Sequence, residues 1–262
     1  MSGRGLVEDR SRDDGVAVLT LNRPEVRNAI DDALLEALLA AVVRLAADGA
    51  AARCVIVRGA GLSAFSAGMD LHERASFSDA QLTAQHERIV ALMTALTELP
   101  VPVIASVEGF CLAGGFELAL ACDLIVASRD AIFGLPETRV GIFPGGGAAR
   151  LLTWSVGAAR ARDLVLTGRR ISGVEADAWG LVARLAEPGG AFSASLSLAA
   201  DLAAAAPLGL REAKRAIRAA AGSLRDGQTA EDAMYDVVTR SEDRREGFRA
   251  FVEKRPPRFE GR

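Results

Sequence analysis

The sequence predicts an α/β fold built mainly on parallel strands. Short apolar runs alternate with longer segments of helical periodicity, a pattern typical of parallel sheets covered by helices. Glycine and proline residues separate these segments. From residue 191 onward the pattern is purely helical and rich in alanine. A chain of 262 residues can bury a full core. We therefore expect an α/β core over residues 1–190 and a C-terminal helical segment over residues 191–262.

Strands and helices are expected to alternate in the first hundred residues. The run 15–22 alternates and ends near a proline, and the run 53–58 is a short buried strand ended by glycines. Between them, residues 31–48 form a helix with a broad leucine and valine face and aspartates in its first turn. Ser78 and Gln81 have the spacing of a capping box ahead of a further helix, which two prolines end.

The middle of the chain holds the stretch around which we expect the function to be organised. The apolar run 103–107 predicts a buried strand, and a glycine-rich turn then leads into an apolar helix that begins near Gly114. Further strands are expected over 123–127 and 131–133. The helices of the C-terminal segment are expected near 191–205, 207–221, 228–240 and 241–253.

The composition argues against several classes of protein. A net charge of −3 with both signs mixed gives no basic surface for nucleic acid. No apolar run approaches the roughly 20 residues that span a bilayer. The first fourteen residues are polar and acidic, so we expect no signal peptide and a cytoplasmic location. Cys54, Cys111 and Cys122 have unrelated spacings and apolar neighbours, which predicts buried thiols without disulfides. Two histidines without a ligand pattern predict no metal site, and Walker and dinucleotide motifs are absent.

Two carboxylates and two glycine-rich corners indicate the chemistry. The turn before Gly114 leaves the first amides of the following helix without partners, at the end where the helix dipole favours negative charge. Glu117 lies one turn inside that helix, among apolar neighbours where an unpaired charge is costly. Glu137 follows twenty positions later, and a second corner follows at 144–147. This set suits a reaction in which negative charge develops on an oxygen while protons move.

These residues and their neighbours resemble the enoyl-CoA hydratase/isomerase family, the crotonase superfamily. The matching segments are Ala64–Leu71, Val103–Ala105, Gly109, Gly114–Ala119, Cys122–Asp123, Phe133–Glu137 and Gly141–Gly145. They keep the family's order and spacing from Asn22-Arg23-Pro24 to Glu253-Lys254-Arg255, which covers almost the whole chain. The set is specific as a whole, whereas each motif alone is weak.

The resemblance implies a crotonase-like spiral of β-β-α repeats, with a C-terminal helical segment that packs on neighbouring subunits in a homotrimer or a dimer of trimers. The implied activity is that of a lyase of fatty acid metabolism, the reversible hydration of a 2-trans-enoyl-CoA thioester to a 3-hydroxyacyl-CoA. The acyl-CoA is then the expected partner, without nucleic acid or membrane. Coenzyme A enters as part of the substrate, so no separate cofactor is expected.

By the same resemblance, the thioester oxygen rests between the backbone amides of Met69 and Gly114. Glu117 and Glu137 hold one water between them, and the amide of Gly145, at the start of the next helix, is the third partner of that water. One glutamate takes a proton from the water as hydroxyl adds to the β-carbon, and the other supplies a proton to the α-carbon. The sequence does not assign these two roles.

Coenzyme A contacts are also implied, together with a variable acyl pocket. The expected contacts are Arg27, Ala29, Ala67, Gly68, Met69, Asp70, Leu71, Gly114 and, on the same or an adjacent subunit, Lys254. Ala113 stands where the family usually has the first glycine of a triplet. Phe116 and Phe143 are expected to reshape the acyl pocket. The loop 71–74 is where family members differ in substrate, so straight-chain enoyl thioesters are the starting expectation.

Other functions remain open on the same scaffold. The first alternative is a double-bond isomerase or another acyl-CoA lyase. A second class comprises relatives that bind RNA or lack catalysis, although the acidic balance and the two intact glutamates argue against both. A serine peptidase on a related spiral needs a Ser/His/Asp set, and His72 and His86, the only histidines, both fall in the region expected to be the variable pocket loop.

Overall fold

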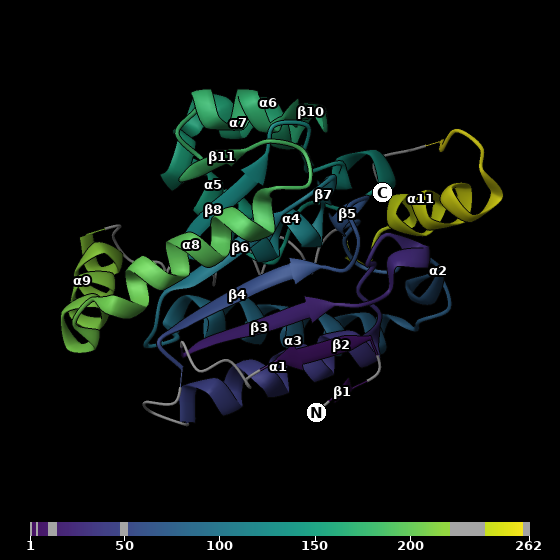
Figure 1. The fold of residues 1–262 in the computed structure, drawn as a ribbon. Helices are drawn as coiled ribbons and strands as arrows, with labels where there is room; N and C mark the ends of the chain where they lie inside the picture. The colour runs from purple at the N-terminus through teal and green to yellow at the C-terminus, as the bar shows by residue number, and fades with distance from the viewer. Residues whose placement is uncertain (1, 4, 10–14, 48–51, 221–238, 259–262) are drawn as a thin grey trace.

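The computed structural model describes residues 2–3, 5–9, 15–47, 52–220 and 239–258, and its strands form two sheets (Figure 1). The larger sheet contains, in spatial order, β1 (Ser2–Gly3), β2 (Leu6–Asp9), β3 (Val16–Leu21), β4 (Cys54–Gly59), β6 (Val103–Val107), β8 (Leu124–Ser128) and β11 (Arg184–Ala186). The smaller sheet contains β10 (Arg170–Ser172), β9 (Ile132–Gly134), β7 (Phe110–Leu112) and β5 (Ala64–Ser66).

Helices surround both sheets. The longer ones are α1 (Asp32–Ala47), α3 (Asp79–Glu98), α5 (Ala148–Val156), α6 (Ala158–Thr167), α8 (Ala191–Ala204), α9 (Pro207–Ala220) and α11 (Glu242–Glu253). The shorter ones are α2 (Leu71–Arg74), α4 (Gly114–Leu120), α7 (Gly173–Ala178) and the 3₁₀ helices η1 (Pro24–Val26) and η2 (Glu137–Val140). Strands β3, β4, β6, β8 and β11 pair in parallel, and only β1 and β2 add antiparallel pairs to this sheet. The predicted α/β architecture with mainly parallel strands is confirmed.

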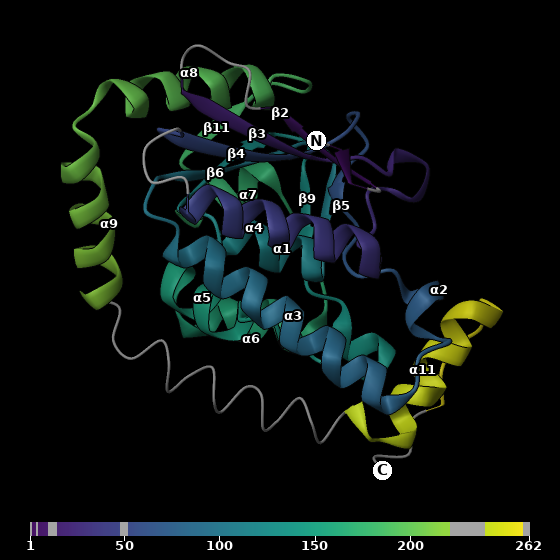
Figure 2. The ribbon, with the colours of Figure 1, turned by 90° about the horizontal axis from the view of Figure 1, so that it is seen from below.

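The central strands of the larger sheet are buried on both faces, which explains their continuous apolar runs. In β4, alternate side chains belong to two different cores. Val55 and Val57 face the core that includes α1 and α3, whereas Cys54 and Ile56 face α8. Figure 2 shows α1 and α3 side by side on one face, and Figure 1 shows α8 crossing the other. The first helix of the predicted C-terminal segment is therefore packed on the α/β core.

The elements that the sequence predicts on a clear periodicity are present, with ends shifted by a few residues. The three-residue strands β5, β7 and β10 and the single-turn helix α2 were not predicted, because three or four residues are too few to show a period. Strand β2, which lies between β1 and β3, was also missed, since it consists of two apolar and two acidic residues without alternation. The helix expected over 228–240 lies almost entirely outside the described residues.

Two expectations from composition can be compared with the fold. Cys54, Cys111 and Cys122 are buried and unpaired, as predicted, and burial raises the pKa of each thiol. Within the described ranges no single helix is long and apolar enough to cross a membrane. Helices α8 and α9 reach that length and composition only as a pair, with a bend of 108° between them.

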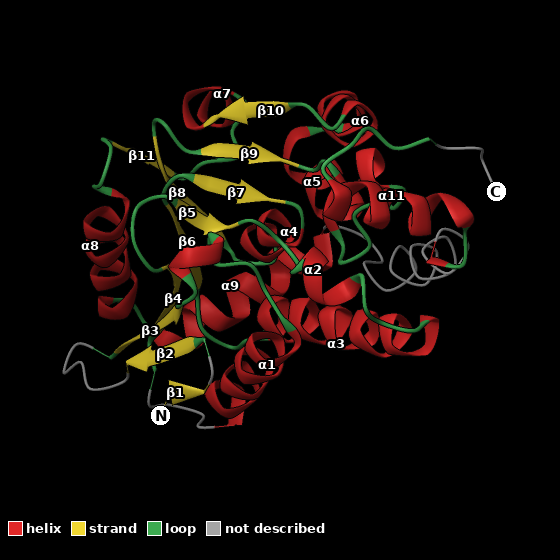
Figure 3. Ribbon diagram, turned by 90° about the vertical axis from the view of Figure 1, so that its right-hand side faces the viewer, coloured by secondary structure: helices red, strands yellow, loops and turns green. Residues whose placement is uncertain are grey.

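The smaller sheet brings distant parts of the chain to one place. Its strands β5, β7 and β9 are parallel neighbours, so their carboxyl ends lie at the same edge of the sheet (Figure 3). The chain continues from β5 into residues 67–70, from β7 into the start of α4, and from β9 into η2. Crevices at the carboxyl ends of parallel strands are common ligand sites. Three segments predicted to carry the chemistry thus converge.

Candidate active site

A cavity of about 660 Å³ opens at this edge. The predicted site residues that line it are Arg27, Ala29, Ala67, Met69, Asp70, Leu71, Gly114, Glu117, Glu137 and Gly145. Gly68 lies directly behind the wall of the cavity, because a Cβ on it would approach the Gly114 nitrogen to 3.1 Å. Lys254 is exposed at the carboxyl end of α11 and is not part of the lining. Its coenzyme contact stays a prediction, as does the homotrimer or dimer of trimers.

The amides of Met69 and Gly114 lie close together at the cavity wall. Met69 forms an isolated parallel bridge with Ile30, in which the Gly68 carbonyl and the Asp70 amide take the hydrogen bonds on the Ile30 side. The Met69 amide consequently points to the opposite side of its strand. A Cβ on Gly114 would lie 3.6 Å from the Met69 nitrogen. Within the described part of the chain neither amide has a protein acceptor, which is the arrangement an anionic oxygen requires.

Main-chain hydrogen bonds fix the strand that carries Met69. The Ala67 amide donates to the Arg27 carbonyl at 3.0 Å, the Ile30 amide donates to the Gly68 carbonyl at 2.8 Å, and the Asp70 amide donates to the Ile30 carbonyl at 2.9 Å. Because these bonds run along the whole strand, the position of the Met69 amide is determined by backbone register and not by its own side chain.

An arginine that the sequence did not single out as a site residue reinforces this strand. The Arg23 guanidinium donates to the Ala29 carbonyl at 2.7 Å and to Asp70 Oδ2 at 3.1 Å, and it lies 3.3 Å from Asp31 Oδ2. The other oxygen of Asp70 accepts from the amides of His72 and Glu73 and so caps α2. Arg23 thus connects Asp70, at the carboxyl end of the segment 67–70, to residues 29–31. We call this segment, which carries the Met69 amide, the oxyanion strand.

Backbone strain is concentrated beside the same amides. Gly68 has a φ of +97°, and a Cβ there would come within 2.7 Å of the Ala113 Cβ. Ala113 itself has a φ of +50° and a ψ of −131°, a conformation that favours glycine. The departure noted in the sequence, alanine in place of a family glycine, therefore falls at a strained position.

Glu117 is held by amides from the second glycine-rich corner. Its side chain is buried, and Oε1 accepts from the Gly146 amide at 2.7 Å and from the Ala148 amide at 3.3 Å. Backbone donors at the start of a helix stabilise negative charge on such a carboxylate. The predicted position of this helix was wrong: α5 begins at Ala148, so Gly145 lies in the preceding turn. Gly145 lines the cavity, and its bond to a water stays a prediction.

Glu137 has the opposite environment. It is buried at the start of η2, and its Oε2 has no hydrogen-bond partner among the described residues. Burial raises the pKa of Glu137 well above the ordinary value of 4.5; the nearby charge of Glu117 raises it further, and the Arg74 guanidinium lowers it only in part. One carboxylate of the pair is therefore stabilised as an anion by donors, and the other is favoured as an acid.

Two arginines flank an aromatic ring at another part of the lining. The guanidinium carbons of Arg27 and Arg170 lie 5.1 and 5.7 Å from the centre of the Phe110 ring, and both side chains are exposed. Both residues also line the cavity. Arg27 was predicted to bind coenzyme A, whereas Arg170 was not. The sequence gave no sign of Arg170, because its place beside Phe110 depends on the antiparallel pairing of β10 with β9.

The two aromatic residues expected at the acyl pocket lie in different places. Phe143 lines the cavity as expected, but Phe116 does not: it is fully buried in the core, 5.2 Å from the ring of Phe133. The face of α4 that carries Phe116 is turned toward the core, which the sequence does not reveal because every residue of this helix except Glu117 is apolar or glycine. Phe251 of α11 also lines the cavity, and the centre of its ring lies 5.5 Å from the centre of the His72 ring.

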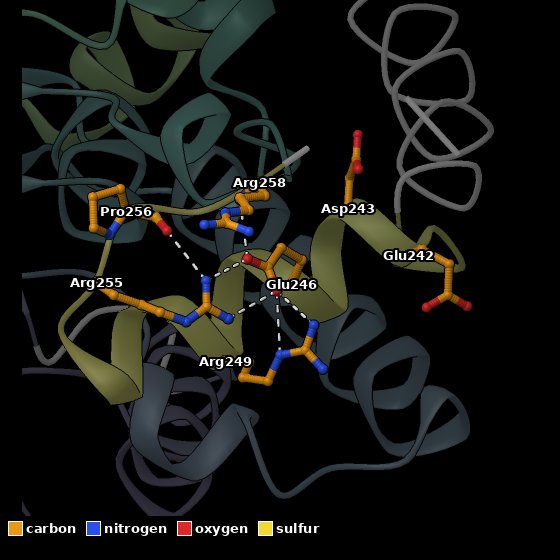
Figure 4. Close-up of a pocket in the computed structure, with 7 residues that line it drawn as sticks. All are labelled: Glu242, Asp243, Glu246, Arg249, Arg255, Pro256 and Arg258. Carbon is orange, nitrogen blue, oxygen red and sulfur yellow. Dashed lines mark hydrogen bonds and ion pairs between the residues drawn. The ribbon is translucent and has the colours of Figure 1, made fainter. Parts of the chain in front are cut away.

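A second hollow of about 700 Å³ lies beside α11 and shares no residue with the first (Figure 4). Figure 4 shows Arg249 and Arg255 directed at Glu246. Glu246 accepts hydrogen bonds from both side chains and from the Arg258 amide, and these bonds lower the pKa of Glu246. The charges of Glu246, Arg249 and Arg255 in this hollow are thus neutralised by ion pairs with each other. No cluster of three metal-ligating side chains occurs in the ranges that the structure describes.

The chain is similar to known proteins over almost its whole length. A family model described as enoyl-CoA hydratase/isomerase matches residues 11–262. The chain is 40% identical over 252 residues to the mitochondrial enoyl-CoA hydratase domain-containing protein 2 of Bos taurus, covering 94% of this chain and 85% of that protein. It is 38% identical over 260 residues to the mitochondrial methylglutaconyl-CoA hydratase of Rattus norvegicus, covering 97% and 82%. A crystal structure of an enoyl-CoA hydratase from Bacillus anthracis has a TM-score of 0.80 at 37% identity, covering 98% of this chain and 100% of that one.

Proposed function

Because the chain belongs to the enoyl-CoA hydratase/isomerase family, we propose that it catalyses the reversible hydration of a 2-trans-enoyl-CoA thioester to a 3-hydroxyacyl-CoA. Its fold is that of the crotonase relatives, as the resemblance implies. The names of the relatives include both general enoyl-CoA hydratases and a methylglutaconyl-CoA hydratase. Family membership therefore leaves the acyl group open.

The observation that carries the proposal is the unequal pair of buried carboxylates in one cavity with two converging amides. Glu117, held by the amides of Gly146 and Ala148, is the base in this scheme, and it takes a proton from a water as the hydroxyl oxygen bonds to C3. The electrons of the double bond move to the thioester oxygen, where the amides of Met69 and Gly114 stabilise the charge. Glu137, the protonated member, then delivers its proton to C2.

Crotonyl-CoA tests the proposal directly, because hydration removes its conjugated absorbance. We expect turnover by the unmodified protein and a loss of about 10²- to 10⁴-fold in kcat for Glu117→Gln and for Glu137→Gln, the usual contribution of an acid or base. Glu98→Gln is a matched control, since Glu98 is exposed and forms an ion pair with Arg218 at 3.2 Å.

Two outcomes would count against hydration. An isomerase would leave crotonyl-CoA unchanged and convert a 3-enoyl thioester into its conjugated isomer. If the protein binds no acyl-CoA in calorimetry, it is not an acyl-CoA enzyme. Salt-dependent binding to RNA would then test the alternative of an RNA-binding relative.

A further inference from the structure

Helix α11 presents one face to the rest of the molecule. Its residues on this face follow one another at the i, i+3, i+4 and i+7 spacing of a single helical stripe. They are Arg244, Gly247, Phe248 and Phe251. The first three are buried, and Phe251 lines the active-site cavity. Figures 1 and 2 show α11 beside α2, although the two helices lie far apart in the sequence. This face joins α11 to the elements that enclose the cavity.

The contact between α11 and η2 leaves no room for side chains. A Cβ on Gly247 would lie 2.1 Å from the Val140 carbonyl oxygen and 2.5 Å from the carbonyl carbon. On the other side of the contact, Gly141 follows the last residue of η2, and a Cβ on it would lie 2.4 Å from the Asp243 carbonyl oxygen. Because closely packed backbone cannot accept a methyl group at such distances, both partners need glycine at the point of contact.

The contact with α11 is passed directly to Glu137. The Gly141 amide donates to the Glu137 carbonyl, and the Ile142 amide donates to the same oxygen at 3.2 Å. The carboxylate of Glu117 is held by two amides, whereas Glu137 Oε2 has no hydrogen-bond partner among the described residues. The position of the Glu137 side chain therefore depends on its backbone, and that backbone is bonded to the residue that contacts α11.

Other contacts keep α11 and η2 in place. Phe248 packs with Leu82 and Ile142 in a small apolar cluster. The Arg244 guanidinium donates to Asp79 Oδ1 at 2.6 Å, which joins α11 to the first turn of α3. Helix α6 also contacts η2. The segment that begins with Glu137 is thus packed against helices from two separate parts of the chain.

We propose that α11 positions the catalytic acid, in that the close contact of Gly247 with η2 determines where Glu137 presents its proton to C2. This inference rests on the proposed function and adds a positioning residue to it. Gly247 acts through Val140 and Gly141 and needs no contact with the substrate. A displacement of about 1 Å in a catalytic group is enough to lower a rate about 10²-fold.

A matched pair of helical glycines tests the assignment. Gly247→Ala places a methyl group against the Val140 carbonyl, so α11 must move away from η2. Gly209→Ala, in α9, places it 3.8 Å from the Ala206 Cβ, which is an ordinary contact. Alanine is the better helix former at both positions, so helix propensity does not explain a loss. We expect Gly247→Ala to lower kcat for crotonyl-CoA about 10- to 100-fold with little change in KM, and Gly209→Ala to keep the kcat of the unmodified protein.

The Glu137→Gln background separates positioning from general damage. If α11 acts through the acid, Gly247→Ala should cost little in this background, because the group that it positions is already gone. A further loss of about 10- to 100-fold would overturn the inference and would show that α11 acts on the fold or on another group. An unchanged kcat in a folded Gly247→Ala variant would overturn it as well.

Hydrogen exchange of the unmodified protein keeps the test independent of variant folding and of catalysis. As urea is raised below the unfolding transition, the amides of Gly141 and Ile142 should lose protection together with those of α11, since packed neighbouring elements open as one unit. Protection of these two amides that persists after α11 has opened would overturn the inference.

The two proposals fail in different ways. If η2 and α11 open together but crotonyl-CoA is not hydrated, the proposed function fails while the contact that holds Glu137 stands. If crotonyl-CoA is hydrated and kcat is insensitive to Gly247→Ala, the positioning role fails while the proposed function stands.

Discussion

The two ends of the cavity are built from different material. At the reacting end the groups that hold charge are mainly main-chain amides, those of Met69, Gly114 and Gly146, and they are placed by strand register and by helix starts. At the acyl end the lining consists of side chains from α2, α3, η2 and α11. Amides keep their place whatever side chain they carry, whereas a side-chain wall changes with each substitution. Under the proposed function, the fold therefore fixes the reacting groups, and a few side chains select the acyl group.

The largest effect on activity is expected from a Cβ added at Gly68, next to the amides of Met69 and Gly114. In Gly68→Ala the new methyl group would meet the Ala113 Cβ at 2.7 Å and the Gly114 nitrogen at 3.1 Å, at a φ of +97°. The loop must shift, and we expect kcat for crotonyl-CoA to fall about 10²- to 10³-fold, the cost of losing one oxyanion donor, with a smaller change in KM. Gly61→Ala is the control, since Gly61 also has a positive φ but has nothing within 4 Å of its Cβ. Equal kcat values for the two variants would contradict a main-chain oxyanion hole at this place.

The second-largest effect on kcat is expected from the ion pair between Arg23 and Asp70, which holds the oxyanion strand in place. Arg23→Met and Asp70→Asn each remove the contact at 3.1 Å, while asparagine still caps α2. We expect each variant to lower kcat about tenfold, and the double variant to lose about as much as one single variant, which corresponds to a coupling of about 1.4 kcal/mol. The exposed pair of Arg215 with Glu212 at 2.8 Å provides the control cycle, for which a coupling of about 0.5 kcal/mol or less is expected. Additive losses at Arg23 and Asp70 would show that the pair does not act as a unit.

The contrast between the two carboxylates is also visible in stability. The pKa of Glu137 is raised in the folded protein above its ordinary value of 4.5, chiefly by burial and then by Glu117. The folded state therefore keeps a proton that the unfolded state releases. The associated stability is fully present below about pH 4.5 and is lost as pH rises through the raised pKa.

Glu137→Gln removes this titration. Relative to the variant, the unmodified protein should lose up to about 1.4 kcal/mol of unfolding free energy for each pH unit within that window, the limit for one proton. Urea unfolding at a series of pH values measures the difference. Parallel curves for the two proteins would mean that Glu137 ionises in the fold as it does in water.

The sequence predicted the reacting end better than the acyl end. Glu117 carries a local signal, a charge in an otherwise apolar helix, and the family spacing adds Glu137, Met69 and Gly114. Arg74 carries no such signal, because its burial depends on α11, which lies far away in the sequence. Phe116 was assigned to the wrong surface for the same reason. Local patterns give periods and turns, whereas the convergence of side chains from separate elements depends on tertiary packing.

The smallest expected effect lies where the backbone of the reacting end is strained. Ala113 adopts a φ of +50° and a ψ of −131°, and such strain costs of order 1–3 kcal/mol. Ala113→Gly relieves this strain. The glycine also makes the unfolded chain more flexible, which lowers the free energy of unfolding by about 0.5–1 kcal/mol and offsets part of the gain. We expect a net stabilisation of about 1 kcal/mol in chemical unfolding, and a change in kcat far smaller than that of Gly68→Ala, because the Gly114 amide keeps its place. Ala40→Gly, at an exposed position within α1, should instead destabilise by about 1 kcal/mol. If both variants destabilise alike, Ala113 stores no strain, and the amides beside it are positioned by hydrogen bonds alone.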